Sequence, residues 1–108
     1  MPDTNAARAC LETQLVELEG RLARIAADLA EPLAADSSEA AVETEDDAAL
    51  EAQAVLVTQE IASVKRALER IAEGTYGECV QCGNEIAEGR LEARPEAALC
   101  IECASRNG

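Results

Sequence analysis

Four cysteines near the C-terminus constrain this sequence more than any other feature. They follow the pattern C-x2-C-x17-C-x2-C and are Cys79, Cys82, Cys100 and Cys103. Each C-x-x-C pair can direct two thiolates to one point, and two such pairs complete a tetrahedron around Zn²⁺. The 17 intervening residues fall in the length range that is typical of zinc sites. We therefore predict one structural Zn²⁺ per chain, whose four thiolate ligands leave no open position for catalysis.

Other uses of these cysteines have less support. Two disulfides in a small secreted domain would fit the pattern, but residues 1–8 contain no apolar stretch of an export signal. Thioredoxin-like chemistry needs only one C-x-x-C pair, whereas this chain has two pairs and no histidine. No segment approaches the ~20 apolar residues of a membrane span. We expect a cytoplasmic protein, whose thiols stay reduced and available to metal.

Two series of apolar residues upstream of the cysteines have the spacing of helix seams. Steps of four and three residues separate their members, as in the a and d positions of heptads. The series are Leu11, Leu15, Leu18, Leu22, Ile25 and Leu29, and then Leu50, Ala54, Val57, Ile61, Val64, Leu68 and Ile71. Pro32 interrupts the first pattern, and Gly74 follows the second at a position suited to a helix C′ residue. The fold class predicted is all-α.

The two series are mirror images about one point. Pairs such as Leu22 with Val57 share a centre between residues 39 and 40. Because an antiparallel hairpin of two helices requires a common centre, we place its apex at residues 36–41. An intermolecular coiled coil is the alternative that the heptads leave open. We expect a monomer, with a coiled-coil hairpin over residues 1–73 and a small zinc-finger domain over residues 74–108.

The charge of the chain is strongly negative and unevenly distributed. There are 22 acidic residues against 9 basic ones, which gives a net charge of −13. This balance argues against contacts with nucleic-acid phosphates, which require Lys and Arg, and against an anionic membrane surface. The sequence has no basic residue between Arg24 and Lys65, so the predicted apex is acidic. Composition alone favours a solvated face over a tip suited to a cationic cavity or metal-bearing site on a partner.

Asp36 and Glu39 also have a purely structural interpretation. Asp36 or Ser37 can cap the second helix, and a Glu three residues after Asp36 resembles a capping box. Acidic residues in a first helical turn also interact favourably with the helix dipole. We expect this capping role whatever else the two carboxylates do.

The cysteine-rich segment has few apolar side chains of its own. They are Tyr76, Ile86, Leu91 and Leu99. We expect that they would not hold residues 75–103 folded without the metal. Arg90 and Arg94 are expected to form local ion pairs, since this segment is itself net acidic. Cys10, a lone thiol beside Leu11, is interpreted as a packing residue.

Residues 74–103 resemble the C4 zinc fingers of the DksA/TraR family. The resemblance rests on GTYGECVQCGNEI at 74–86, RLEARP at 90–95 and LCIEC at 99–103. It implies a bacterial transcription regulator that binds RNA polymerase directly, with a coiled-coil hairpin that enters the secondary channel. The family's tip motif, D-x-x-D-x-A, approaches the catalytic region and would fall here on Asp36, Glu39 and Ala41. This position coincides with the apex inferred from the seams, which favours a functional tip.

The sequence also departs from the family's pattern. Glu39 replaces the second Asp of the tip motif and adds a methylene of reach. Residues 51–64 contain no Lys or Arg, so the basic contacts through which larger members help the polymerase hold ppGpp have no counterpart. We therefore do not expect ppGpp dependence. We expect a short member that lacks the N-terminal extension and the C-terminal helix of larger ones.

The leading hypothesis is therefore a regulator that binds RNA polymerase rather than DNA. The chain has no histidine for general base catalysis and no phosphate-cradling loop, so we do not expect an enzyme. One alternative is a thiol or zinc redox sensor, in which oxidation of the cysteine cluster expels the metal. The other is a zinc ribbon that binds nucleic acid, which the charge of the chain disfavours.

Overall fold

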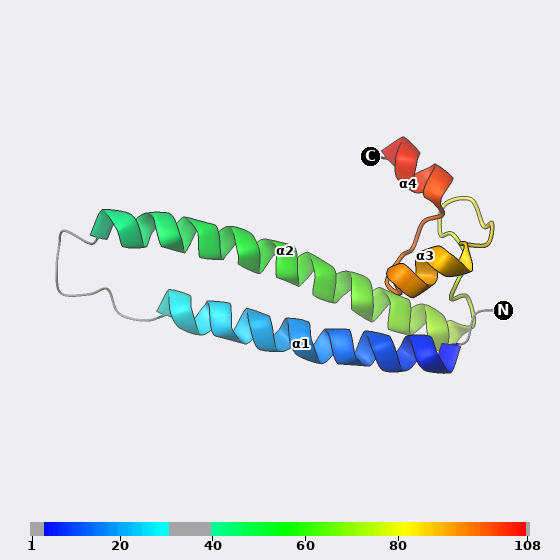
Figure 1. Ribbon diagram of the computed structural model, residues 1–108, viewed down its shortest axis with the longest axis horizontal. Helices are drawn as coiled ribbons and strands as arrows, with labels where there is room; N and C mark the ends of the chain where they lie inside the picture. The colour runs from blue at the N-terminus through cyan, green and yellow to red at the C-terminus, as the bar shows by residue number, and fades with distance from the viewer. Residues whose placement is uncertain (1–3, 31–39, 108) are drawn as a thin grey trace. The chain divides into compact units, whose positions relative to one another are not determined.

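The protein is all-α within the residues that the structure describes. The computed structural model describes residues 4–30 and 40–107, and of residues 40–46 and 107 the backbone alone. The helices are α1 (Thr4–Ala30), α2 (Ala40–Glu73), α3 (Glu88–Ala93) and α4 (Ile101–Asn107) (Figure 1). Over these described ranges there is no strand, and one isolated antiparallel bridge joins Glu78 to Glu85. The predicted fold class, two long helices followed by a small cysteine-rich segment, is confirmed.

The chain divides into two compact units. One combines Met1–Leu15 with Ala62–Gly108, and the other is Val16–Ile61. In each unit a segment of α1 lies beside a segment of α2 that runs in the opposite direction (Figure 1). The predicted domain boundary after residue 73 stays a prediction.

In the unit Val16–Ile61 the two helices pack through the predicted seams. Leu18 and Ile25 of α1 and Val57 and Ile61 of α2 are buried. The remaining seam residues of this unit are half-buried: Leu22, Leu29, Leu50 and Ala54. Two packed helices provide no third element to cover both edges of the seam. Consequently only one of the two heptad positions of α1 is fully enclosed.

In the other unit the start of α1 packs against the end of α2. Leu11 and Val64 are among the most deeply buried side chains of the described residues. Ala67 is also fully buried, although the seam pattern does not include it. It follows Val64 by three residues and precedes Ile71 by four, which puts all three on one helix face. Leu68, which the pattern does include, is half-buried.

Gly74 ends α2 as predicted. Its φ of 83° lies in the left-handed region that favours glycine. The Gly74 N–H donates to the carbonyl of Ile71 at 3.2 Å, and the Thr75 N–H donates to that of Arg70 at 2.9 Å. These two bonds form a Schellman motif, which satisfies carbonyls that the helix itself leaves unpaired. The chain thereby turns away from α2 into the cysteine-rich segment.

The two short helices are findings of the structure. The sequence indicated neither α3 nor α4. Helices of six and seven residues are too short for a periodic apolar pattern to reveal. Tyr76, Ile86 and Leu91 are buried, whereas Leu99 is half-buried. No helix in the described ranges is long and apolar enough to cross a membrane.

Candidate metal centre

The four predicted cysteines lie together. The sulfur atoms of Cys79, Cys82, Cys100 and Cys103 are all within 4.8 Å of one another. The Cys82 and Cys100 sulfurs are 3.7 Å apart. Tetrahedral zinc with Zn–S bonds of about 2.3 Å requires sulfur–sulfur separations of about 3.8 Å. The cluster therefore fits a single zinc ion.

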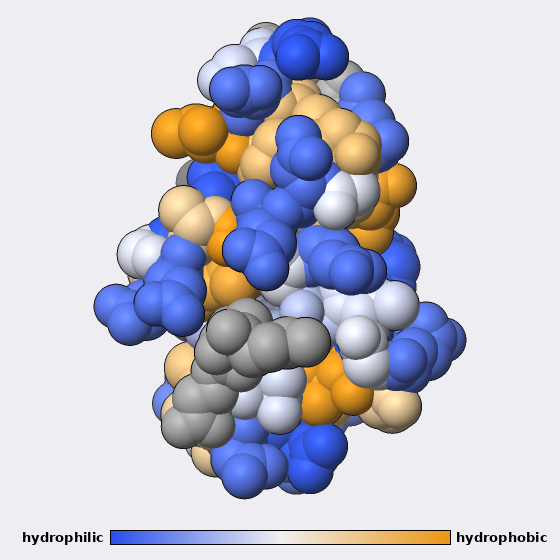
Figure 2. Space-filling model, turned by 90° about the vertical axis from the view of Figure 1, so that its right-hand side faces the viewer, coloured by the Kyte–Doolittle hydropathy of each residue, from blue (hydrophilic) through white to orange (hydrophobic). Residues whose placement is uncertain are grey.

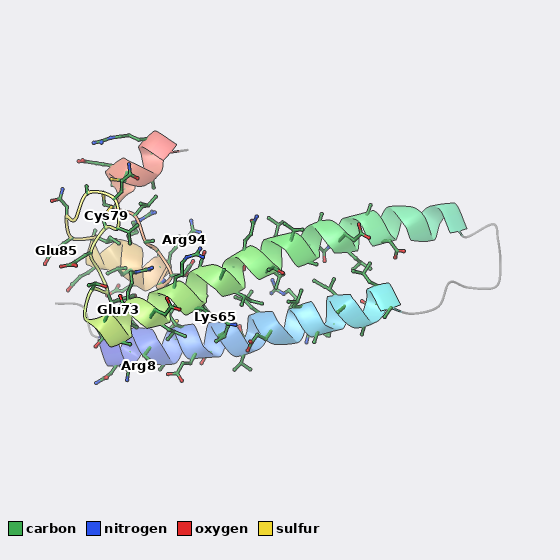
Figure 3. The ribbon with its side chains drawn as sticks, turned by 180° about the vertical axis from the view of Figure 1, so that it is seen from behind. Arg8, Lys65, Glu73, Cys79, Glu85 and Arg94 are labelled. Carbon is green, nitrogen blue, oxygen red and sulfur yellow. The ribbon has the colours of Figure 1, made fainter. Side chains whose placement is uncertain are left out.

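The first cysteine pair lies in a tight turn that follows α2. Gly77 and Gly83 flank this pair with φ angles of 91° and 79°, so both positions have the left-handed backbone that favours glycine. The Cys79 N–H donates to the Asn84 carbonyl at 2.8 Å, and the Gly83 N–H donates to the Cys79 carbonyl at 2.9 Å. These bonds close the loop around Cys79, which Figure 3 labels. The local sequence thus sets the geometry of this pair.

The second pair is set by a helix start. Cys100 immediately precedes α4, and Cys103 lies in its first turn. The Ala104 N–H donates to the Cys100 carbonyl at 2.9 Å, so helical geometry begins at Cys100. Residues three apart share a helix face, which brings these two thiols together. The Val80 N–H donates to the Ala98 carbonyl at 2.9 Å and joins the two pairs.

The four thiols have different surroundings. Cys79 and Cys103 are buried, Cys100 is half-buried and Cys82 is exposed. Backbone N–H groups of Cys100 and Cys82 donate to the Cys79 sulfur and lower the pKa of this thiol to about 6. Burial raises the pKa of the Cys103 thiol. The backbone thus favours a thiolate at Cys79, the form that binds metal.

The structure contradicts two of the expectations about individual side chains. Arg94 pairs with Glu96 at 3.4 Å, as predicted. Arg90 forms no ion pair within the described part of the chain, and its Nε donates instead to the Leu99 carbonyl at 2.9 Å. That prediction was wrong, because α3 directs Arg90 towards the segment that leads into Cys100. Cys10 is exposed, so its interpretation as a packing residue is also wrong.

The surface near the metal centre is mixed in character. Val80 and Ile101, each following the first cysteine of a pair, are exposed apolar side chains. On the face that Figure 2 shows, hydrophobic side chains are interspersed with hydrophilic ones. Isolated apolar residues of this kind are normal on protein surfaces and do not by themselves indicate a partner.

The predicted tip lies largely outside the described residues. Asp36 and Glu39 fall in the range 31–39, which the structure does not describe. Ala41 lies in α2, where its side chain is likewise not described. The role of these three residues stays a prediction.

Two family definitions match the chain. Residues 74–107 match the prokaryotic dksA/traR C4-type zinc finger, and residues 8–71 match the DnaK suppressor protein-like N-terminal domain. Together they cover the cysteine cluster and most of both long helices.

Individual proteins agree with the family matches. The RNA polymerase-binding transcription factor DksA of Salmonella typhimurium is 44% identical over 43 residues. This match covers 40% of this chain and 28% of that protein, less than a third of the relative's length.

Solved structures match over most of the chain. The transcription factor DksA2 of Pseudomonas aeruginosa aligns with a TM-score of 0.84 and 30% identity, covering 99% of this chain and 90% of the other. A DnaK suppressor protein from Agrobacterium tumefaciens aligns with a TM-score of 0.70 and 36% identity, covering 98% and 95% of the two chains. With its C4 cluster and its paired long helices, the chain belongs to the DksA/TraR family of C4-type zinc-finger proteins.

Proposed function

We propose that this protein is a bacterial transcription regulator that binds RNA polymerase directly, through its pair of long helices. The observation that carries the proposal is the alignment with DksA2 over 99% of this chain at a TM-score of 0.84. Relatives named RNA polymerase-binding transcription factors support the same partner. The net charge of −13 disfavours direct DNA binding.

The zinc ion has a structural role in this proposal. Cys79, Cys82, Cys100 and Cys103 would hold it, and bound zinc would crosslink the loop after α2 to the start of α4. Four thiolates leave no coordination position for substrate, which supports a protein that is not an enzyme. The proposal further includes a monomer in the cytoplasm.

Asp36 and Glu39 would carry the regulatory effect. The support is the family's tip motif, which falls on Asp36, Glu39 and Ala41, and the absence of any basic residue between Arg24 and Lys65. Carboxylates delivered through the secondary channel would act on the metal-bearing catalytic region or on the loops around it. Affinity would come mainly from the helices, and regulation mainly from the tip.

A binding and transcription experiment tests both parts. In a pull-down with purified polymerase, we expect the parent chain and an Asp36→Asn, Glu39→Gln variant to bind alike. The variant should lose the parent's effect on promoter-complex lifetime. The matched control is Glu51→Gln with Glu60→Gln, which removes the same charge from exposed positions of α2. A tip variant that regulates like the parent would reduce the motif to a helix cap, and a parent that does not bind polymerase would refute the proposed function.

A redox-sensing role is the second candidate, and the exposure of Cys82 beside Cys100 favours it. Their sulfurs are 3.7 Å apart, so modest movement would allow a bond of about 2.05 Å. Hydrogen peroxide would oxidise the two thiolates to one disulfide and, taking up two protons, would be reduced to two waters while zinc is released. Reversible zinc release that changes transcription would support this role, and release without such a change would exclude it.

A further inference from the structure

Residues 95–99 form the segment that leads into Cys100. Every second backbone carbonyl of this segment accepts a hydrogen bond from a side chain elsewhere in the same unit. The bonds are Tyr76 hydroxyl to the Pro95 carbonyl at 2.9 Å, Arg70 Nη2 to that of Ala97 at 3.5 Å, and Arg90 Nε to that of Leu99 at 2.9 Å. The contact of Arg70 is at the limit of hydrogen-bond distance. Its Nε is buried without a partner in the described residues. Tyr76 and Arg90 are therefore the two firm anchors.

The carbonyl that Arg90 contacts belongs to the peptide group that leads directly into Cys100, one of the four predicted metal ligands. The Leu99 carbonyl and the Cys100 N–H belong to the same planar peptide unit, so a contact that fixes one fixes the other. The Cys100 N–H in turn donates to the sulfur of Cys79. A continuous series of hydrogen bonds therefore runs from Arg90 through the peptide between residues 99 and 100 to Cys79. This series links the two cysteine pairs.

We propose that Arg90 is a positioning residue of the metal centre, which fixes the peptide between Leu99 and Cys100 and with it the backbone of a cysteine of the cluster. A guanidinium on the carbonyl also polarises this peptide and strengthens the bond that its N–H donates. Groups that hydrogen-bond to metal ligands in this way hold the ligands in place and tune the metal. The inference rests on the proposed zinc site of four cysteines.

The surroundings of Arg90 suit this role. Leu91, the next residue of α3, is buried and anchors the helix. The Arg90 N–H donates to the Ala87 carbonyl at 3.0 Å, which fixes the first turn of α3. Tyr76 holds the start of the 95–99 segment independently. Removing Arg90 should therefore leave the segment in place and release only the peptide beside Cys100.

Arg94 provides a matched control. It lies at the end of α3, as Figure 3 shows, is largely exposed and pairs with Glu96. Arg90→Met and Arg94→Met remove the same charge one helical turn apart, and Met has a side chain of similar length without an N–H donor. Only the first of these changes removes a donor to the peptide that adjoins a metal ligand.

The experiment compares zinc affinity, by competition with a chromogenic chelator, and the spectrum of the cobalt-substituted protein. We expect Arg90→Met to weaken zinc binding about 10- to 100-fold, the range typical of groups that support metal ligands. Its sulfur-to-cobalt charge-transfer bands should also shift. Arg94→Met should stay within about twofold of the parent, because an exposed ion pair contributes little. Arg90→Lys, which keeps the charge and a donor, should recover part of the affinity.

The outcomes separate this inference from the proposed site. Equal zinc affinities and equal cobalt spectra for Arg90→Met and Arg94→Met would overturn the role of Arg90 while leaving the four-cysteine site intact. A parent protein without thiolate-to-cobalt bands would instead refute the site itself. Helix content, measured by circular dichroism, checks that each variant folds. If Arg90→Met does not fold, Arg90→Lys decides. Weaker zinc affinity or an altered cobalt spectrum supports the role, because Lys lacks the guanidinium that contacts the Leu99 carbonyl, whereas parental values of both refute it.

Discussion

Two valines of α2 allow the helix seam to be tested within a single unit. Val57 and Val55 are two residues apart, and both belong to the unit Val16–Ile61. Val57 is 4% exposed and Val55 is 56% exposed. Replacing either by Ala removes the same two methyl groups and changes helix propensity by the same amount. The difference between the variants therefore isolates the effect of burial.

The expected magnitudes follow from these exposures. Burying two methyl groups contributes roughly 1.6 kcal/mol at about 0.8 kcal/mol each, and nearly all of it is lost in Val57→Ala. A residual cavity adds up to about 1 kcal/mol, and better helix propensity returns about 0.6 kcal/mol. Val57→Ala should thus lower the free energy of unfolding by about 1–2 kcal/mol. In Val55→Ala a loss of roughly 0.7 kcal/mol is offset by the same gain in propensity, so the net change should be near zero.

Urea unfolding followed by circular dichroism at 222 nm measures this difference. Both variants should keep the zinc content and the slope of the parent, so that a shift in midpoint reports stability. We expect a clearly lower midpoint for Val57→Ala and an unchanged one for Val55→Ala. Equal shifts for the two variants would refute the seam, because they would mean that Val57 is no more enclosed than Val55.

Three further predictions concern the metal, the tyrosine and the state of assembly. Cys82→Ser should lose most of the zinc in a metal analysis and unfold residues 75–103 while the long helices persist, and full zinc content would contradict the ligand assignment. Burial raises the pKa of Tyr76, so phenolate absorbance at 295 nm, which this single tyrosine dominates, should titrate above the ordinary value of about 10 in the folded protein and near it in urea. Because the folded pKa is raised, the contribution of Tyr76 to stability is present below the unfolded pKa and is lost as pH rises through the folded one. Titration of the phenol at the same pH in the folded protein and in urea would refute the burial of Tyr76. Light scattering at low concentration should give the 11.4 kDa of one chain, whereas a doubled mass would support an intermolecular coiled coil.

Periodic and local sequence patterns predicted much of the fold. The heptad steps predicted both long helices and their antiparallel pairing, because residues at a and d positions share one face of a helix. The spacing of the cysteines predicted the metal site, since each C-x-x-C pair brings two sulfurs together through backbone geometry within a few residues. Gly74 was recognisable as a helix end because a glycine follows the last residues of the second apolar series, and its left-handed φ agrees with that position.

The tertiary structure decided what depends on the path of the chain. The heptads did not indicate that Ala67 is fully buried while Leu68 is only half-buried, because that difference depends on what covers each edge of the seam. Arg90 was expected to form an ion pair, but α3 places it on the Leu99 carbonyl instead. The sequence alone determined which residues can bind a metal and which face of each helix is apolar, since both follow from spacing. Which carbonyl accepts the hydrogen bond from Arg90 depends on where the segment before Cys100 lies relative to α3. Only the folded chain determines that position.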